Sequence, residues 1–171
     1  MNWFTADEHM NHANIITKFV FRPFKSAEEM NEVIIARHNE RVKNNDMVFH
    51  LGDFKFSAQG PNTYELRKRL NGTHIFIRGN HDKHNGLNTP IRHMVIESYG
   101  KKILLIHRPE DAILIMDVYK DIDLAFVGHI HEKWKGKDKM INVGVDQWNF
   151  YPIHAQQILK YYSQVLKGRE E

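Results

Sequence analysis

The most constraining feature of this 171-residue sequence is a recurring pattern of short apolar runs, each ending in glycine and a side chain that can bind metal. Three runs with the residues that follow them are Met47–Leu51 before Gly52 and Asp53, Thr73–Ile77 before Gly79 and Asn80, and Leu124–Val127 before Gly128 and His129. Such runs predict short strands. Because ligands bind beyond the carboxyl ends of strands in α/β sheets, the pattern predicts a sheet edge that gathers polar groups.

Helices are predicted between these strands. Ser26 and Glu29 have the spacing of a capping box, and apolar residues follow at helical intervals, which predicts a helix over Ser26–Asn45. The other expected elements are a strand at Trp3–Ala6, helices at Asn11–Lys18, Asn62–Leu70 and Asp111–Asp121, a hairpin of Met94–Tyr99 and Lys102–Ile106, a strand at Met140–Val145, and a helix or strand at Ala155–Leu166. This alternation predicts one α/β domain over residues 1–171 with no cap domain.

Composition limits the classes of protein that fit. The chain is 42% hydrophobic and 26% charged, which is typical of globular proteins, and its net charge of +3 is too small to indicate a polyanionic partner. The absence of cysteine excludes disulfides, thiolate metal ligands and cysteine nucleophiles. No secretory signal or apolar run of about 18 residues is visible, so we expect a cytoplasmic protein with no membrane partner. The sequence leaves the oligomeric state open.

Twelve histidines are unusual for this length and prompt a search for ligand spacing. The metal-ligating side chains that follow predicted strands are Asp7, His9, Asp53, Asn80, His107, His129 and His131. Nitrogen and oxygen donors without sulfur suit Mn²⁺, Fe²⁺, Co²⁺, Ni²⁺ or Zn²⁺. Seven donors fit two ions that share a carboxylate, and two ions about 3.5–4 Å apart can clamp phosphorus for in-line displacement.

Spacing within two of the motifs supports convergence. Asp7 with His9, and His129 with His131, are pairs two residues apart, whose side chains point to the same side of an extended backbone. Each motif alone has an ordinary alternative, since glycine, asparagine and aspartate favour turns. The ordered recurrence of the motifs after four strands favours a shared site.

The motifs Asp7-x-His9, Gly52-Asp53, Gly79-Asn80-His81-Asp82, His107 and Gly128-His129-x-His131 together resemble the signature of the calcineurin-like metallophosphoesterase superfamily. The flanking segments Arg22–Phe24, His50–Phe54 and Asn142–Asn149 further resemble small single-domain bacterial and phage members. It implies an α/β fold of the four-layer αββα type, in which two mixed β-sheets are flanked by helices.

The resemblance also implies site roles. The implied ligands are Asp7, His9 and His131 for a first ion, Asn80, His107 and His129 for a second, and Asp53 for both. His81 would lie near the scissile phosphate and protonate the leaving oxygen, while Asp82 would orient that imidazole and favour its charged form. The implied cofactors are two divalent metal ions (Mn, Fe, Ni, Co or Zn), with manganese favoured.

Substrate contacts are less clearly marked. Arg22, Arg108 and His12 are candidates for binding phosphate. A surface salt bridge is the alternative for Arg108, and helix capping or packing is the alternative for His12. Glu8 is expected to face solvent. The basic segment Lys133–Lys139 favours a solvated hairpin turn over a nucleic-acid contact.

We therefore predict a phosphoesterase that hydrolyses phosphodiester bonds through a metal-activated hydroxide. Its partner would be a phosphate-ester substrate, such as a cyclic nucleotide, a 2′,3′-cyclic phosphate or nucleic acid, because no cap domain narrows the cleft. The alternatives are a phosphomonoesterase or pyrophosphatase of the same fold, and a non-catalytic metal-binding scaffold.

Overall fold

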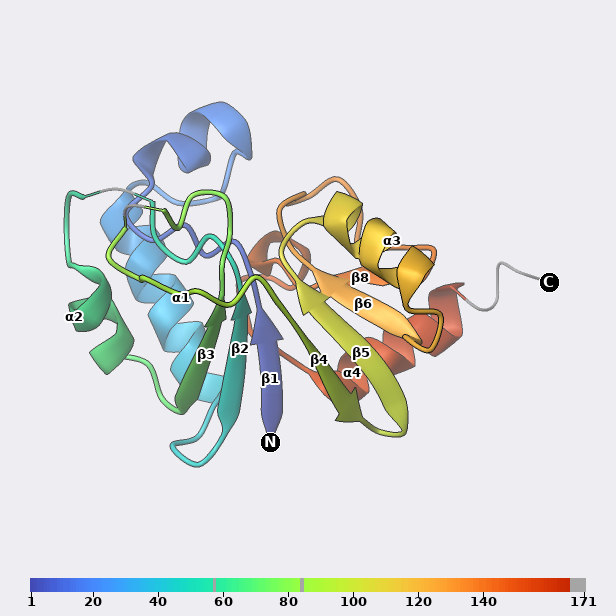
Figure 1. The fold of residues 1–171 in the computed structure, drawn as a ribbon. Coiled ribbons are helices and arrows are strands. Elements are labelled where there is room, and N and C mark those ends of the chain that lie inside the picture. Colours follow the sequence, from blue (N-terminus) through green and yellow to red (C-terminus); the bar gives the residue numbers. More distant parts are fainter. Residues whose placement is uncertain (57, 84, 167–171) are drawn as a thin grey trace.

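A computed structural model of the chain describes residues 1–56, 58–83 and 85–166, which form two mixed β-sheets (Figure 1). The first sheet has the order β3-β2-β1-β9, in which β1 to β3 are parallel and β9 is antiparallel. Its strands are β1 Asn2–Thr5, β2 Met47–Leu51, β3 Thr73–Ile77 and β9 Ile153–His154.

The second sheet has the order β4-β5-β6-β8-β7, with parallel pairing of β5, β6 and β8. Antiparallel partners complete it at both edges, where β4 pairs with β5 and β7 pairs with β8. Its strands are β4 His93–Ser98, β5 Lys101–Ile106, β6 Leu124–Val127, β7 Gly136–Lys137 and β8 Met140–Asn142. The predicted hairpin is therefore β4 and β5.

Side-chain alternation along the strands builds the layers. Ile103 and Leu105 of β5 join Phe4 of β1 in the core between the sheets. Leu104 and Ile106 face the opposite side of β5 and join the cluster beneath helix α3, Pro109–Val118. Because strand residues alternate between faces, an uninterrupted apolar strand serves two cores at once.

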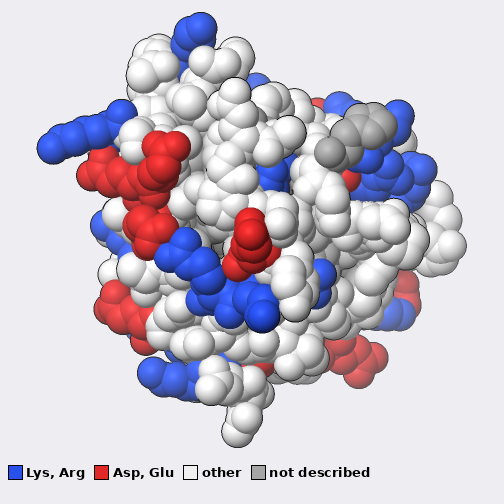
Figure 2. Space-filling model, turned by 90° about the vertical axis from the view of Figure 1, so that its left-hand side faces the viewer, with Lys and Arg blue, Asp and Glu red and all other residues white. Residues whose placement is uncertain are grey.

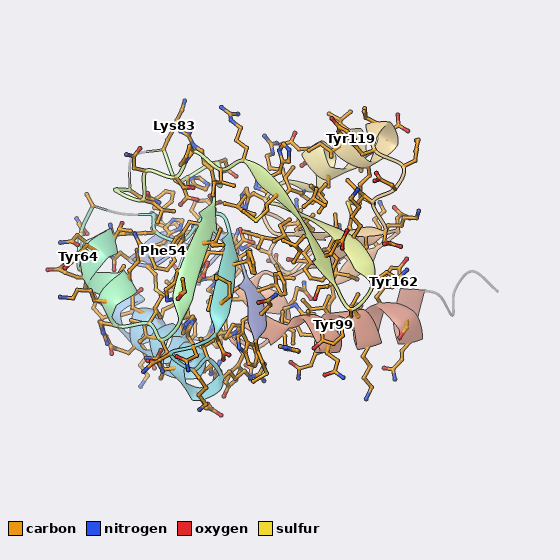
Figure 3. All side chains as sticks on the ribbon, turned by 60° about the horizontal axis from the view of Figure 1, so that its bottom comes forward. Phe54, Tyr64, Lys83, Tyr99, Tyr119 and Tyr162 are labelled. Carbon is orange, nitrogen blue, oxygen red and sulfur yellow. The ribbon has the colours of Figure 1, made fainter. Side chains whose placement is uncertain are left out.

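Helices cover the outer faces. Helix α1 (Ala27–Arg41) and the short α2 (Thr63–Lys68) lie against the first sheet, where Met30, Leu66 and Phe76 share one cluster. Figure 3 shows Phe54 pointing into this interior. With α3 on the second sheet, the result is the predicted α/β sandwich of two mixed sheets flanked by helices.

Most predicted elements are present, with changed ends. Helix α1 begins after Ser26, whose Oγ accepts a hydrogen bond from Glu29 N at 3.2 Å, and it ends before Val42 instead of Asn45 because the backbone there becomes extended. The predicted helix over residues 11–18 is a π-helical turn, η1, at Ile15–Phe19.

Two further segments differ in detail from the prediction. The strand expected over residues 140–145 ends at Asn142, and a 3₁₀ turn, η2, follows at Val145–Gln147. The C-terminal segment is helix α4 (Ala155–Tyr161) followed by a π-helical turn, η3, at Tyr162–Leu166, which resolves the choice in favour of a helix. Residues 167–171 of the expected domain lie outside the described part.

Within the described ranges, no helix combines the length and apolar character needed to cross a bilayer.

The exposed face formed by α1 and α2 carries acidic and basic side chains close together, without a large patch of one sign (Figure 2).

The aromatic core between the sheets gives a stability prediction. Phe126 is fully buried, and its ring lies edge-on to Phe4 at a centroid distance of 4.9 Å. We expect Phe126→Ala to lower the free energy of unfolding by about 3–5 kcal/mol, through lost burial and the cavity left behind. Chemical denaturation measures this. The control Val118→Ala, at a side chain 71% exposed, should change stability by less than about 0.5 kcal/mol, and equal effects would contradict the layered core.

Candidate metal centre

The seven predicted metal ligands lie in loops beyond strand ends of both sheets. Asp7 and His9 follow β1, Asp53 follows β2, and Asn80 follows β3; the remaining three histidines follow β5 and β6, and are His107, His129 and His131. Strands β1 to β3 all run toward the upper edge in Figure 1, where these loops gather. The two sheets thus bring distant segments to one edge.

The first group consists of Asp7, His9 and His131, each offering a ligand atom within 4.8 Å of the others. The Nδ1 atom of His131 lies 2.8 Å from Oδ2 of Asp146, so Nε2 is the nitrogen left for an ion. Within the described residues, His9 Nε2 is buried with no hydrogen-bond partner, and it lies 3.6 Å from Oδ2 of Asp53. A buried, unpartnered nitrogen is costly unless something else binds it, and a metal ion would satisfy it.

The second group consists of Asp53, His107 and His129, again with ligand atoms within 4.8 Å. His107 Nδ1 lies 2.7 Å from the carbonyl oxygen of Leu51, which turns Nε2 toward the group. That Nε2 lies 3.2 Å from Oδ2 of Asp53 and 3.0 Å from Oδ1 of Asn80. The amide oxygen of Asn80 therefore reaches the same point.

Asp53 stands between the two groups. Its Oδ2 faces both His9 and His107, while its Oδ1 accepts a hydrogen bond from the backbone N–H of His81 at 2.8 Å. One carboxylate oxygen thus meets imidazole nitrogens from both sides. The carboxylate, amide and imidazole donors fit divalent metal ions of the first transition row.

The backbone at the site is unusual. Five of the seven residues have left-handed φ values, at 58° for Asp7, 51° for His9, 56° for Asp53, 74° for His129 and 47° for His131. Left-handed backbone at non-glycine residues costs about 1–3 kcal/mol and persists where surrounding contacts enforce it. The extended-strand explanation for the paired motifs is therefore wrong: their side chains converge through left-handed turns.

Contacts between the loops enforce this backbone. Asp7 N donates to Gly52 O at 3.0 Å, and His9 N donates to Asp53 O at 2.9 Å. Gly79 approaches so closely that a Cβ there would lie 2.1 Å from Oδ1 of Asp53. A side chain at position 79 would displace the central carboxylate.

The titratable groups at the site lie close together and shift one another's pKa values. Burial raises the pKa of Asp7 to about 6. Burial opposes charge on His107, but its hydrogen bond to Asp53 and the nearby Asp7 and Asp53 carboxylates raise its pKa to about 9. Burial likewise opposes charge on Asp53, yet His107 and His9 hold the pKa of this carboxyl well below its usual range. The centre therefore favours positive charge beside Asp53, which a divalent ion would supply.

His81 and Asp82 have separate surroundings. The exposed His81 ring lies at the mouth of the centre, with its centroid 5.5 Å from that of His9 and 5.0 Å from that of Phe56. The Asp82 carboxylate accepts hydrogen bonds from four donors, which are the backbone N–H groups of Asp53, Phe54 and Gly79 and the side-chain amide of Asn85. The expectation that Asp82 orients His81 is wrong, because its carboxylate instead ties the loop after β2 to the loop after β3.

Arg22 also has a different role from the one predicted. Its side chain is 1% exposed and forms an ion pair with Asp146 at 2.8 Å. Its terminal nitrogens donate to the carbonyl oxygens of Asp7 at 2.6 Å and Glu8 at 2.9 Å. With its donors committed inside the protein, Arg22 supports the loop after β1 and is not placed to bind phosphate.

Glu8 is buried at 2% exposure, so the expectation of a solvent-facing side chain is wrong. Its Oε1 lies 2.5 Å from Nδ1 of His50, whose Nε2 lies 2.9 Å from Nδ1 of His74. Burial raises the pKa of Glu8 to about 7 and lowers that of His50 to about 3. Burial thus favours the neutral form of each, behind the loop that carries Asp7 and His9.

The two other substrate candidates differ in accessibility. His12 is buried, its ring stacks on Phe56 at 3.7 Å, and its Nδ1 lies 3.2 Å from Nδ1 of His9, which favours the packing alternative. Arg108 is exposed and lies 3.7 Å from Glu110, in the wall of a cleft that also includes Asn80 and His107. Phosphate binding by Arg108 stays a prediction.

Sequence reasoning missed two supporting residues, Asp146 and Asn142. Asn142 is fully buried, and its Nδ2 donates to the carbonyl oxygen of His131 at 2.8 Å. Both lie in the segment 142–149, which contributed to the family resemblance. That resemblance was the sequence signal that could have pointed to them. Nothing in local spacing connects them to His131.

Comparisons with known proteins agree with this geometry. Residues 6–152 match the calcineurin-like phosphoesterase superfamily domain, so the chain belongs to this superfamily. An uncharacterized protein of Methanocaldococcus jannaschii is 37% identical over 164 residues, covering 91% of this chain and 87% of its own. The family prediction is confirmed.

Solved structures support the fold. A protein of unknown function from Aquifex aeolicus superposes with a TM-score of 0.77 and 28% identity, covering 94% of this chain and 98% of its own. An archaeal phosphodiesterase superposes with a TM-score of 0.51 and 18% identity, covering 92% and 94%. The second likeness is one of fold alone.

The Asp146 contact gives a prediction about metal affinity. We expect Asp146→Asn to weaken metal binding by about 10–100-fold, because the carboxylate that orients His131 and pairs with Arg22 is lost. Titration with a competing chelator measures the affinity. Asp123→Asn is the matched control, since Asp123 pairs with Lys101 at a site that is 35% exposed, and it should leave affinity unchanged. Equal affinities for Asp146→Asn and the unmodified protein would contradict the orienting role.

Proposed function

We propose that the protein is a phosphodiesterase that depends on two divalent metal ions, with Mn²⁺ favoured. The observation that carries the proposal is the position of Asp53, whose Oδ2 lies 3.6 Å from His9 Nε2 in one group and 3.2 Å from His107 Nε2 in the other. A carboxylate placed in this way suits an oxygen ligand shared by two ions. Membership of the phosphoesterase superfamily supports the same chemistry.

In this proposal each group holds one ion. The proposed ligands are Asp7, His9 and His131 for the first ion, Asn80, His107 and His129 for the second, and Asp53 for both. When bound, such ions polarise a phosphoryl oxygen and make water a stronger nucleophile. Residues 1–171 would form one catalytic domain.

The chain's own residues would do the remaining work. His131 and His107 are each fixed through Nδ1, by Asp146 and by the Leu51 carbonyl, so that the Nε2 atoms need no reorientation on binding. His81, exposed at the mouth, is proposed to give its proton to the ester oxygen that leaves. Its backbone N–H donates to Asp53, which ties its position to the central carboxylate.

The surroundings favour a diester over a monoester. The centre adjoins a cleft of about 630 Å³ that is open to solvent, which leaves room for a large ester substituent beside the second metal group. A phosphomonoester carries a single ester substituent and has less need of such space.

Substituting the central carboxylate tests the proposal. We expect Asp53→Ala to abolish turnover of a bis-aryl phosphate in Mn²⁺ and to lower the metal content per chain in elemental analysis, because both proposed ions lose a ligand. The unmodified protein should turn over the bis-aryl phosphate faster than the mono-aryl phosphate. Full activity of the Asp53→Ala variant would contradict the proposed dinuclear centre. Faster turnover of the mono-aryl phosphate would favour the phosphomonoesterase alternative.

The leaving group distinguishes the role of His81. We expect His81→Gln to lower kcat by about 10²–10⁴-fold for an alkyl-ester leaving group, which needs a proton, and much less for p-nitrophenolate, which does not. Steady-state rates on the two diesters measure the difference. An equal loss on both substrates would show that His81 does not act as the general acid.

A further inference from the structure

A cleft lined by basic side chains adjoins the proposed metal centre. It lies between the loop after β3 and helix α3, and residues at the start of β4 and the end of β5 also line it. Asn80 and His107 line it on the side of the second metal group. In Figure 3, Lys83 projects from the loop along this edge, and Tyr119 marks the end of α3 across from it. Its volume of about 630 Å³ is that of a site for a small organic ligand.

Basic side chains dominate the charge of this cleft. Arg78, Lys83, Arg92 and Arg108 line it, against the single carboxylate of Asp111. Arg108 is also 3.7 Å from Glu110, an exposed pair of little strength. Among the described residues, no carboxylate forms an ion pair with the other three cations, whereas surface cations elsewhere, such as Lys101 and Lys102, do have acidic partners. The cleft therefore has positive charge available for an anion.

Apart from the imidazoles of His93 and His107, the described part of the lining offers no aromatic ring on which a base could stack. No phenylalanine, tyrosine or tryptophan is among the described residues that line the cleft, and its apolar wall consists of Ile106, Leu114 and Ile115. Proteins that bind single-stranded nucleic acid through its bases stack them on aromatic rings. Guanidinium groups, by contrast, match phosphate oxygens in charge and geometry.

Resting on the proposed function, we propose that the substrate carries a second phosphate beside the scissile diester and that this phosphate binds in the basic cleft through Arg92, Lys83 and their neighbours. The substrate class is then a short nucleotide chain recognised by its phosphates and not by its bases. The one-sided position of the cleft, beside Asn80 and His107, places the second phosphate on one side of the reacting phosphorus.

Three thymidine dinucleotides that share one diester bond test this. One has no terminal phosphate, one has a 5′-phosphate and one has a 3′-phosphate. We expect one terminal phosphate to raise kcat/KM over the unphosphorylated dinucleotide by about 10–100-fold, as a charge-assisted phosphate contact would. The gain should shrink as ionic strength rises, because the cations are exposed.

Substitutions of the basic residues test whether the terminal phosphate binds in this cleft. In Arg92→Gln, and independently in Lys83→Gln, the ratio of kcat/KM between the phosphorylated and unphosphorylated dinucleotides should fall several-fold toward one. Lys137→Gln, an exposed residue of β7 outside the cleft with the same change in charge, should leave the ratio unchanged. Because the readout is a ratio within each variant, a partial loss of folded protein does not affect it.

The outcomes separate this inference from the proposed function. No turnover of a bis-aryl phosphate in Mn²⁺ would overturn the proposed function itself. Turnover of that diester with a ratio near one for both phosphorylated dinucleotides would overturn only the second-phosphate site. A high ratio that Arg92→Gln and Lys83→Gln both retain would do the same.

Discussion

The site depends on one buried carboxylate that belongs to both halves of the molecule. Asp53 follows a strand of the first sheet, yet its Oδ2 lies 3.2 Å from Nε2 of His107, which follows a strand of the second. A carboxylate 2% exposed is unfavourable without nearby positive charge. Because its partners His9 and His107 follow strands of different sheets, the centre is complete only when the two sheets are packed together.

Buried polar contacts behind the candidate ligands hold their side chains in place. Arg22 connects Asp146, behind His131, with the backbone of Asp7 and Glu8, so one guanidinium supports both ends of the first group. Asp82 performs a similar function between the loops after β2 and β3. These contacts hold the side chains in one arrangement although their backbone is strained and left-handed. Without such contacts a flexible loop would relax to an unstrained backbone.

The strands and the seven candidate metal ligands could be proposed from the sequence because their signals are local. Met47–Leu51 and Thr73–Ile77 have the predicted bounds, since glycine or a turn follows each apolar run. Helix ends were less accurate: α1 stops at Arg41, three residues before the asparagines expected to end it, because the chain turns there toward β2. The roles assigned to Arg22, Glu8 and Asp82 failed because each depends on a partner from a distant segment.

The sequence by itself determined the family, the order of the strands along the chain and the set of seven candidate side chains, since periodicity, glycines and motif residues occupy neighbouring positions. Only the tertiary structure decided which imidazole nitrogen faces the centre, which charged groups are buried behind it and where a basic cleft opens beside it. The physical reason is distance along the chain. Arg22 and Asp146 are 124 residues apart, and no local pattern specifies a contact that forms only when two sheets pack together.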